Sequence, residues 1–305
     1  MQSKLISESE IQEMLQFTSV SHAAAWLKRT PEYAKAWADL DENSLHRGQI
    51  EKLLKASIFK DFSKIYQFAN PEQRKFLDLY SRRYEIRVLK EIMTNLFDHK
   101  STDAVDVSPY CDFFRRHSKL DLDRLTACTT MDEFINALKG NEFYVPLSRI
   151  QNHDTALLFD YGMALDLYYF SMIWNVRKKL FSGKDLEQIT TAYGEKFDML
   201  NLQFISRSKR YFSMAPADIY ALLIPMNYKL KKEEITALVE ASTREEAQQI
   251  FRKTYYGKKY DHLSAHNLEE FYNYMLRTTL EKASRKDPYS VAMLYSYMYL
   301  SLIHI

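Results

Sequence analysis

The chain has 305 residues, which from length alone suggests about two domains of roughly 150 residues each. Only 6 Gly and 7 Pro are present, too little turn material for a sheet-rich protein, so the composition favours an all-α fold. The formal net charge of +2 argues against a nucleic-acid-binding protein, and the two cysteines form neither a metal-binding spacing nor a disulfide framework.

The first predicted element recurs twice, and we name it repeat A. Its copies read TSVSHAAAWLKRTPEY at 18–33, TTMDEFINALKGNEFY at 129–144 and STREEAQQIFRKTYYG at 242–257, and they align without gaps. Apolar residues recur at i, i+3 and i+4 in each copy, as on one face of a helix. The same offsets hold for a short apolar-faced helix just before each copy.

The turns within repeat A carry helix-capping signals. Thr130 with Glu133 and Thr243 with Glu246 match the capping box, in which the two side chains satisfy helix N-terminal N–H groups reciprocally. The first copy has Ser19 but lacks the glutamate. Each repeat A, with the helix before it, is therefore predicted to be a short helix, a capped turn and a second helix.

A different element, repeat B, lies between the copies of repeat A. It reads YSRRYEIRVLKEI at 80–92 and YGEKFDMLNLQFI at 193–205. The charged positions that correspond are Arg83 with Lys196 and Glu85 with Asp198. Recurrence within one chain favours a shared structural role, so we predict that these four residues make contacts within their own domains.

Repeats A and B alternate with a period of about 112 residues, far longer than the period of solenoid repeats. Three related helical domains with an approximate three-fold arrangement are therefore predicted, at 1–113, 114–227 and 228–305. A third repeat B would fall just past Ile305. We expect the third domain to be truncated, its last residues to be non-native and the first domain to be clipped.

The segment from Pro288 to Ile305 contains no Asp, Glu, Lys or Arg and approaches the ~20 residues that span a bilayer. Its serines and tyrosines favour a buried helix instead, with Asp287 as N-cap and Pro288 in the first position. No transmembrane segment is predicted. Polar residues follow Met1, so no secretory signal is predicted either.

Candidate catalytic and metal-binding groups have simpler interpretations. His262 and His266 are spaced i, i+4 but lack the glutamate and third ligand of a zinc site. Acidic residues interrupt several segments and are more often helix-capping or solvated groups: Asp39, Asp41, Glu42, Asp121, Asp123, Asp160 and Asp166. No phosphate loop or nucleophile motif is present. We predict no catalytic, metal or cofactor-binding residues.

Two basic clusters follow repeat B or lie within it. Arg82 and Arg87 belong to the first, and Arg207, Lys209 and Arg210 to the second. They are candidates for contact with an acidic partner, which would raise the association rate and set the orientation. Internal pairing or a solvated face is the more common role of such residues.

These segments together carry a family resemblance. SRRYEIRVLKEI, EKFDMLNLQFISRSKRYF, PMNYKLKKEEITALVEASTREEAQQIFRKTYYG and DPYSVAMLYSYMYL resemble the C subunits of bacterial and archaeal V-type (A/V-type) ATPases, the family to which the d subunit of eukaryotic V-ATPases belongs. The resemblance covers nearly the whole chain. It implies a funnel of three helical domains, with one end on the membrane rotor ring and the other receiving the central shaft.

By this resemblance, the chain is expected to be a non-catalytic central-stalk subunit that couples the soluble shaft to the ion-translocating ring. It would lie on the cytoplasmic face of the membrane, without a span or cofactor of its own. Two alternatives stay open: a helical scaffold that binds peptides or helices, which predicts one continuous groove, and an enzyme with a carboxylate-lined metal pocket.

Overall fold

The computed structural model describes residues 8–30, 33–38, 40–98, 107, 111–151, 156–259, 268–287 and 289–303, and every regular element in these ranges is a helix. The all-α fold is therefore confirmed. The chain divides into two compact units, Met1–Asn141 with Leu294–Ile305, and Glu142–Met293, which we call unit 1 and unit 2. The three-domain division drawn from the repeats stays a prediction.

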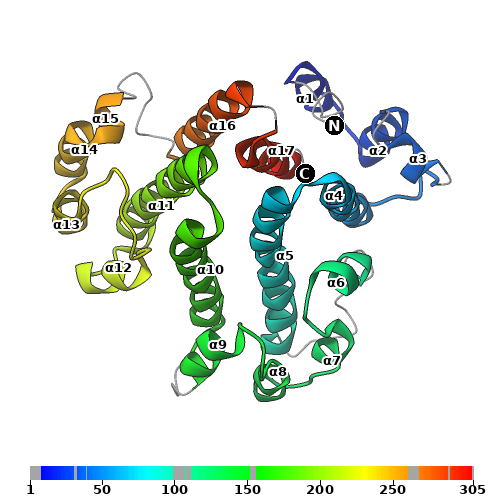
Figure 1. Ribbon diagram of the computed structural model, residues 1–305, viewed down its shortest axis with the longest axis horizontal. Coiled ribbons are helices and arrows are strands. Elements are labelled where there is room, and N and C mark those ends of the chain that lie inside the picture. Colours follow the sequence, from blue (N-terminus) through cyan, green and yellow to red (C-terminus); the bar gives the residue numbers. More distant parts are fainter. Residues whose placement is uncertain are drawn as a thin grey trace. The chain divides into compact units, whose positions relative to one another are not determined.

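Unit 1 contains the first eight helices and the last one from Leu294 onwards. They are α1 (Glu8–Met14), α2 (Val20–Arg29), α3 (Ala34–Trp37), α4 (Arg47–Phe68), α5 (Pro71–Phe97), α6 (Cys111–His117), α7 (Leu122–Thr126), α8 (Met131–Ala137) and α17 (Val291–Ile303). The long helices α4 and α5 pack on each other, α6 packs on α4, and α8 packs on α5 (Figure 1).

The start of α5 is fixed by its sequence. The Asn70 side chain accepts a hydrogen bond from the Gln73 N–H (2.9 Å), the Gln73 side chain accepts one from the Asn70 N–H (3.0 Å), and Pro71 occupies the first helical position. Beyond this cap, one face of α5 buries aromatic rings against α4 and α6. Tyr84 lies 4.9 Å from Phe59, measured between ring centroids. Edge-on aromatic packing of this kind forms the core of unit 1.

Unit 2 contains the remaining helices. They are α9 (Tyr144–Gln151), α10 (Leu158–Leu180), α11 (Gly183–Phe212), α12 (Pro216–Leu222), α13 (Lys232–Glu240), α14 (Arg244–Lys253), α15 (Tyr255–Lys259) and α16 (Leu268–Lys286). The central helix is α11, which packs against α10, α12, α13 and α16 (Figure 1).

Helix α11 is unusual because every residue from Ala192 to Met199 is buried, including the charged side chains of Glu195, Lys196 and Asp198. Charged groups are seldom buried unless they are paired or hydrogen-bonded, because removing them from water costs free energy. The groups that surround this part of α11 are therefore expected to pair or hydrogen-bond with its charged side chains.

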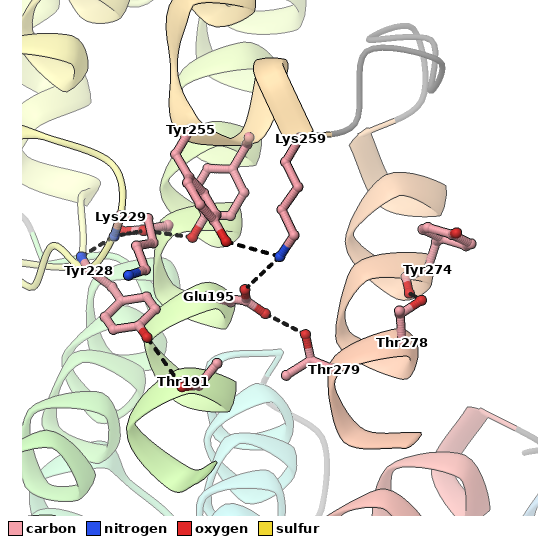
Figure 2. A network of polar contacts seen from close by, with 11 residues as sticks. Thr191, Glu195, Tyr228, Lys229, Tyr255, Lys259, Tyr274, Thr278 and Thr279 are labelled. Atoms are coloured by element: carbon pink, nitrogen blue, oxygen red, sulfur yellow. Dashed lines mark hydrogen bonds and ion pairs between the residues drawn. The ribbon is translucent and has the colours of Figure 1, made fainter. Parts of the chain in front are cut away.

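Close packing on α11 depends on Gly194. A Cβ atom built at this position would lie 2.4 Å from Cγ of Tyr228. The Tyr228 ring occupies the space that any other residue would fill, and its hydroxyl lies 3.2 Å from the Thr191 hydroxyl one turn earlier (Figure 2). The glycine thus lets the segment before α13 approach the backbone of α11.

All three capped turns of repeat A are present. The side chains of Ser19, Thr130 and Thr243 accept hydrogen bonds from backbone N–H groups three residues on, at 3.1, 3.2 and 3.1 Å. The reciprocal half of the box is shifted by one residue. Glu133 and Glu246 accept from the N–H of Thr129 (2.8 Å) and Ser242 (2.7 Å), the residues that precede the caps.

The last helix begins later than predicted. It starts at Val291, and Ser290 rather than Asp287 caps it, with its hydroxyl accepting from the Met293 N–H (3.3 Å). Asp287 instead accepts from the Tyr289 N–H (3.0 Å), while Pro288 lies outside the described residues. The buried-helix interpretation is confirmed from Val291 to Tyr299. None of the described helices combines the length and the apolar character needed to cross a bilayer.

Candidate functional site: buried repeat acids and a basic groove

In the second copy of repeat B, the side chain of Asp198 accepts four hydrogen bonds. It is fully buried, with 0% of its surface exposed. Its Oδ1 accepts from the N–H of Tyr228 (3.0 Å), and its Oδ2 accepts from the N–H groups of Lys229 (2.6 Å) and Leu230 (2.9 Å). The hydroxyl of Tyr256 donates to the same Oδ2 at 2.7 Å. One carboxylate therefore connects α11 to the segment before α13 and to α15.

Burial and hydrogen bonding act on Asp198 in opposite directions. Burial raises the pKa of its carboxyl group, whereas the Tyr256 hydroxyl and the three backbone N–H groups lower it by stabilising the charged form. The balance lies above the usual range. Burial and the neighbouring carboxylate also raise the pKa of the Tyr256 hydroxyl, which keeps it protonated as a donor.

A second buried acid, Glu195, lies one turn before Asp198 and connects α11 to two further helices. Its Oε2 accepts from the hydroxyl of Thr279 on α16 (2.6 Å), and its Oε1 lies 3.6 Å from Lys259 Nζ on α15. Lys259 also donates to the Tyr255 hydroxyl at 3.0 Å. Figure 2 shows Glu195 between Lys259 and Thr279, with Tyr255 beside the lysine.

In unit 1 the residue that corresponds to Asp198 is Glu85, which is 2% exposed. The hydroxyl of Ser118 donates to its Oε1, and Arg82 Nε lies 3.6 Å from its Oε2. Ser118 also accepts from the Leu120 N–H at 3.0 Å. Like Asp198, Glu85 holds the segment that leads into the next repeat A.

The basic partners in repeat B also take comparable positions. Arg83 donates to the hydroxyl of Tyr80, three residues earlier (3.4 Å). Lys196 Nζ lies 5.7 Å from the ring centroid of Tyr193, also three residues earlier, and 5.8 Å from that of Phe170. Both cations therefore lie against an aromatic side chain of their own unit. A structural role for Arg83, Glu85, Lys196 and Asp198 stays a prediction, and these contacts favour it.

A groove in unit 2 contains the second basic cluster. It has a volume of about 780 Å³ and is lined by the end of α11, the turn at 213–216, the end of α13 and the start of α14. Arg207, Lys209 and Arg210 all line it, as does Arg244 on α14. The end of α11, just after repeat B, and the start of α14 in repeat A thus bring cations from two helices to one groove.

The five predicted partner contacts differ in what they touch. Lys209 donates to the carbonyl oxygen of Ala241, the C-cap of α13, and burial lowers its pKa. Arg82 lies close to Glu85, as described above. Arg87, Arg207 and Arg210 are exposed, with the Arg210 guanidinium over the Tyr211 ring at 5.1 Å. The exposed arginines therefore suit a partner contact better than Lys209 or Arg82.

Three of the remaining acidic candidates have local roles. Asp121 caps α7 by accepting from the Arg124 N–H (3.1 Å), Asp160 accepts from the Leu157 N–H at the start of α10 (2.8 Å), and Glu42 pairs with Lys28 (3.2 Å). His262, His266 and Asp39 lie outside the described residues. Within the described ranges, no three His, Cys, Asp or Glu side chains are grouped so that they could hold a metal ion.

Several important groups were not identified from the sequence. Tyr256, Ser118 and Thr279 supply the hydroxyls that meet the buried acids, and Arg244 adds a fourth cation to the groove. For Ser118 and Tyr228–Leu230 a weak signal exists, because SKL and YKL stand at similar distances after Glu85 and Asp198.

The chain is similar to a known protein family and to a known subunit of an ATP synthase. The model of the family described as ATP synthase (C/AC39) subunit matches residues 1–303. The chain is also similar to the C subunit of the A-type ATP synthase of Methanothermobacter thermautotrophicus, with 21% identity over 243 residues. That match takes in 78% of this chain but 59% of the relative, so the chain spans less than two thirds of the relative's length.

Proposed function

Because the chain belongs to the ATP synthase (C/AC39) subunit family, we propose that it is a non-catalytic central-stalk subunit of a rotary V/A-type ATPase. It couples the soluble shaft to the membrane rotor ring that translocates ions. It lies on the cytoplasmic face of the membrane as a peripheral member of the complex. The observation that carries this proposal is the family match, which extends over nearly the whole chain.

The bonding in unit 2 supports a role in transmitting force. An element that passes torque between two partners must resist deformation, and fully bonded buried polar networks make protein interiors rigid. Asp198 and Glu195, both on α11, connect it to the segment before α13, to α15 and to α16. These contacts hold four parts of the unit in a fixed arrangement.

The exposed basic residues supply candidate contacts with neighbouring subunits. Arg207 and Arg210 lie at the groove on α11, and Arg87 is exposed on α5. Cations placed at the edge of an interface mainly affect the association rate and the choice of partner. A coupling subunit needs such orienting contacts rather than a reactive group.

The proposal can be tested by co-purification from the native source. An affinity-tagged full-length chain is expected to bring down both the shaft subunits and the rotor ring, with cross-links mapped to each. A tagged, unrelated helical protein of similar charge serves as control. Recovery of the chain with other partners, and with neither shaft nor ring, would favour the scaffold interpretation and contradict the proposal.

A further inference from the structure

The groove of unit 2 combines an apolar floor with a basic edge. Leu202, Ile205 and Leu238 lie buried beneath it, and Met214 and Phe251 are half-buried in its wall. At its edge Tyr211 is 63% exposed. Interface centres are enriched in aromatic residues, Met and Arg, and this groove contains all three kinds of side chain.

The charge of the groove selects an acidic occupant. Its described lining contains four basic side chains and a single acid, Glu240, which accepts a hydrogen bond from the Tyr220 hydroxyl (3.1 Å). The Nζ atom of Lys209 donates a hydrogen bond to the carbonyl oxygen of Ala241, at the C-terminal end of α13. The exposed Arg207 and Arg210 therefore present positive charge to a partner at the edge of the groove.

The backbone around the groove favours a helix over an extended segment. An added strand needs a row of backbone N–H and C=O groups that lack partners. Here the walls are helices, and in the turn between α13 and α14 the Ala241 carbonyl accepts from Lys209 while the Ser242 N–H donates to Glu246. A partner helix can bind through its side chains alone.

We propose that this groove binds one face of an acidic amphipathic helix from a partner protein. Apolar residues at i, i+3, i+4 and i+7 of that helix would cover the floor, and flanking carboxylates would pair with Arg207 and Arg210. That the partner is another subunit of the same complex rests on the proposed function. The groove adds the chemical character of the partner segment, an acidic amphipathic helix.

The chemistry is tested first without the complex. A fluorescein-labelled peptide of about 15 residues, with Leu at the stated spacing and Glu on its other face, is titrated with the full chain and followed by anisotropy. Saturable binding is expected, weakened by added salt. The same peptide with Lys in place of Glu is expected to bind at least about tenfold more weakly.

Two matched double variants locate the binding. Arg207→Gln with Arg210→Gln is expected to lower the affinity for the acidic peptide about tenfold. Lys184→Gln with Lys232→Gln removes the same charge from exposed positions outside the groove of unit 2 and is expected to change the affinity by less than about twofold. Thermal melts show that each variant is folded. Equal loss in both pairs, or no loss in either, overturns the inference.

The complex then separates this inference from the proposed function. A photo-crosslinking residue placed at Gln248, which lines the groove, is expected to attach to an acidic helical segment of a co-purifying subunit. If shaft and ring co-purify but the cross-link falls on a basic segment, a lipid or a nucleic acid, the inference fails while the proposed function stands. If the peptide binds as expected but neither shaft nor ring co-purifies, the proposed function fails alone.

Discussion

Glu85 and Asp198 occupy equivalent positions in the two copies of repeat B, yet they hold the following segment in different ways. Asp198 accepts directly from three consecutive backbone N–H groups and a tyrosine hydroxyl. Glu85 accepts from the hydroxyl of Ser118, which itself accepts from the Leu120 N–H. The longer side chain reaches the backbone through an intermediate, and the shorter one contacts it directly. The two copies of repeat B therefore hold the segment that follows them with hydrogen bonding of different strength.

The largest difference is expected for Asp198→Ala. The substitution leaves the Leu230 N–H and the Tyr256 hydroxyl buried without this acceptor, and it removes the acceptor of the part-buried Tyr228 and Lys229 N–H groups. The free energy of unfolding should therefore fall by about 3–5 kcal/mol. Urea denaturation measures this change. Glu187→Ala, at an exposed position of the same helix, should cost less than about 0.5 kcal/mol. A loss for Asp198→Ala as small as the control's would show that the carboxylate does not hold the segment.

Next in size is Gly194→Ala, where helix propensity and packing make opposite predictions. Propensity alone predicts that alanine stabilises a helix by up to about 1 kcal/mol relative to glycine. The contact with Tyr228 predicts a loss of about 1–3 kcal/mol, because the new Cβ would overlap the ring. In unit 1 the equivalent residue is Ser81, whose hydroxyl donates to the Asp78 carbonyl (2.8 Å). Melting curves of Gly194→Ala and Ser81→Ala distinguish the two predictions, and a higher melting temperature for Gly194→Ala would contradict ours.

Glu85→Ala is expected to have a smaller effect than Asp198→Ala, about 1–2 kcal/mol, because the contacts described for Glu85 include the Ser118 hydroxyl and a longer ion pair but no direct bond to the backbone of the following segment. Ser118→Ala should cost about 1 kcal/mol by breaking the same connection from the other side. Their double variant should cost less than the sum of the two, since both act on one contact. Strict additivity in a double-mutant cycle would show that Glu85 stabilises unit 1 through other groups.

The smallest effect is expected for Tyr256→Phe, about 1 kcal/mol near neutral pH. In the native protein, the hydrogen bond from the Tyr256 hydroxyl lowers the pKa of Asp198. Removing this hydroxyl therefore raises the pKa of Asp198 further above its usual value. When the pKa of an acid is higher in the folded state than in the unfolded state, the free energy of unfolding falls as the pH rises from the unfolded-state pKa through the folded-state pKa. The cost of Tyr256→Phe should therefore be larger at about pH 7 than at about pH 4, and equal costs would contradict this assignment.

The local structure was predictable where a short pattern fixes a short-range contact. The all-α fold follows from the composition, and the capped turns at Ser19, Thr130 and Thr243 follow from residues three or four positions apart. The start of the last helix was predicted wrongly, because Asp287 and Ser290 are both good caps and it is the Ser290 hydroxyl that accepts from the Met293 N–H.

The candidate site was less predictable because its contacts join distant positions. Repetition pointed to Glu85 and Asp198, but no pattern shows that Tyr256, 58 residues away, donates to Asp198. Likewise, the sequence grouped Lys209 with Arg207 and Arg210, whereas the structure directs Lys209 to a helix end and brings Arg244 to the groove. The proposed function came from the family resemblance, since non-catalytic coupling has no chemical motif.

Membrane vesicles depleted of the chain test most directly the proposed coupling of the soluble shaft to the ion-translocating ring. ATP hydrolysis and ATP-driven ion uptake are measured before depletion, after it, and after the purified full-length chain is added back. We predict that depletion leaves ATP hydrolysis by the soluble part largely intact but abolishes ion uptake. Adding the chain back should restore ion uptake. Unchanged ion uptake in vesicles shown to lack the chain would contradict the account.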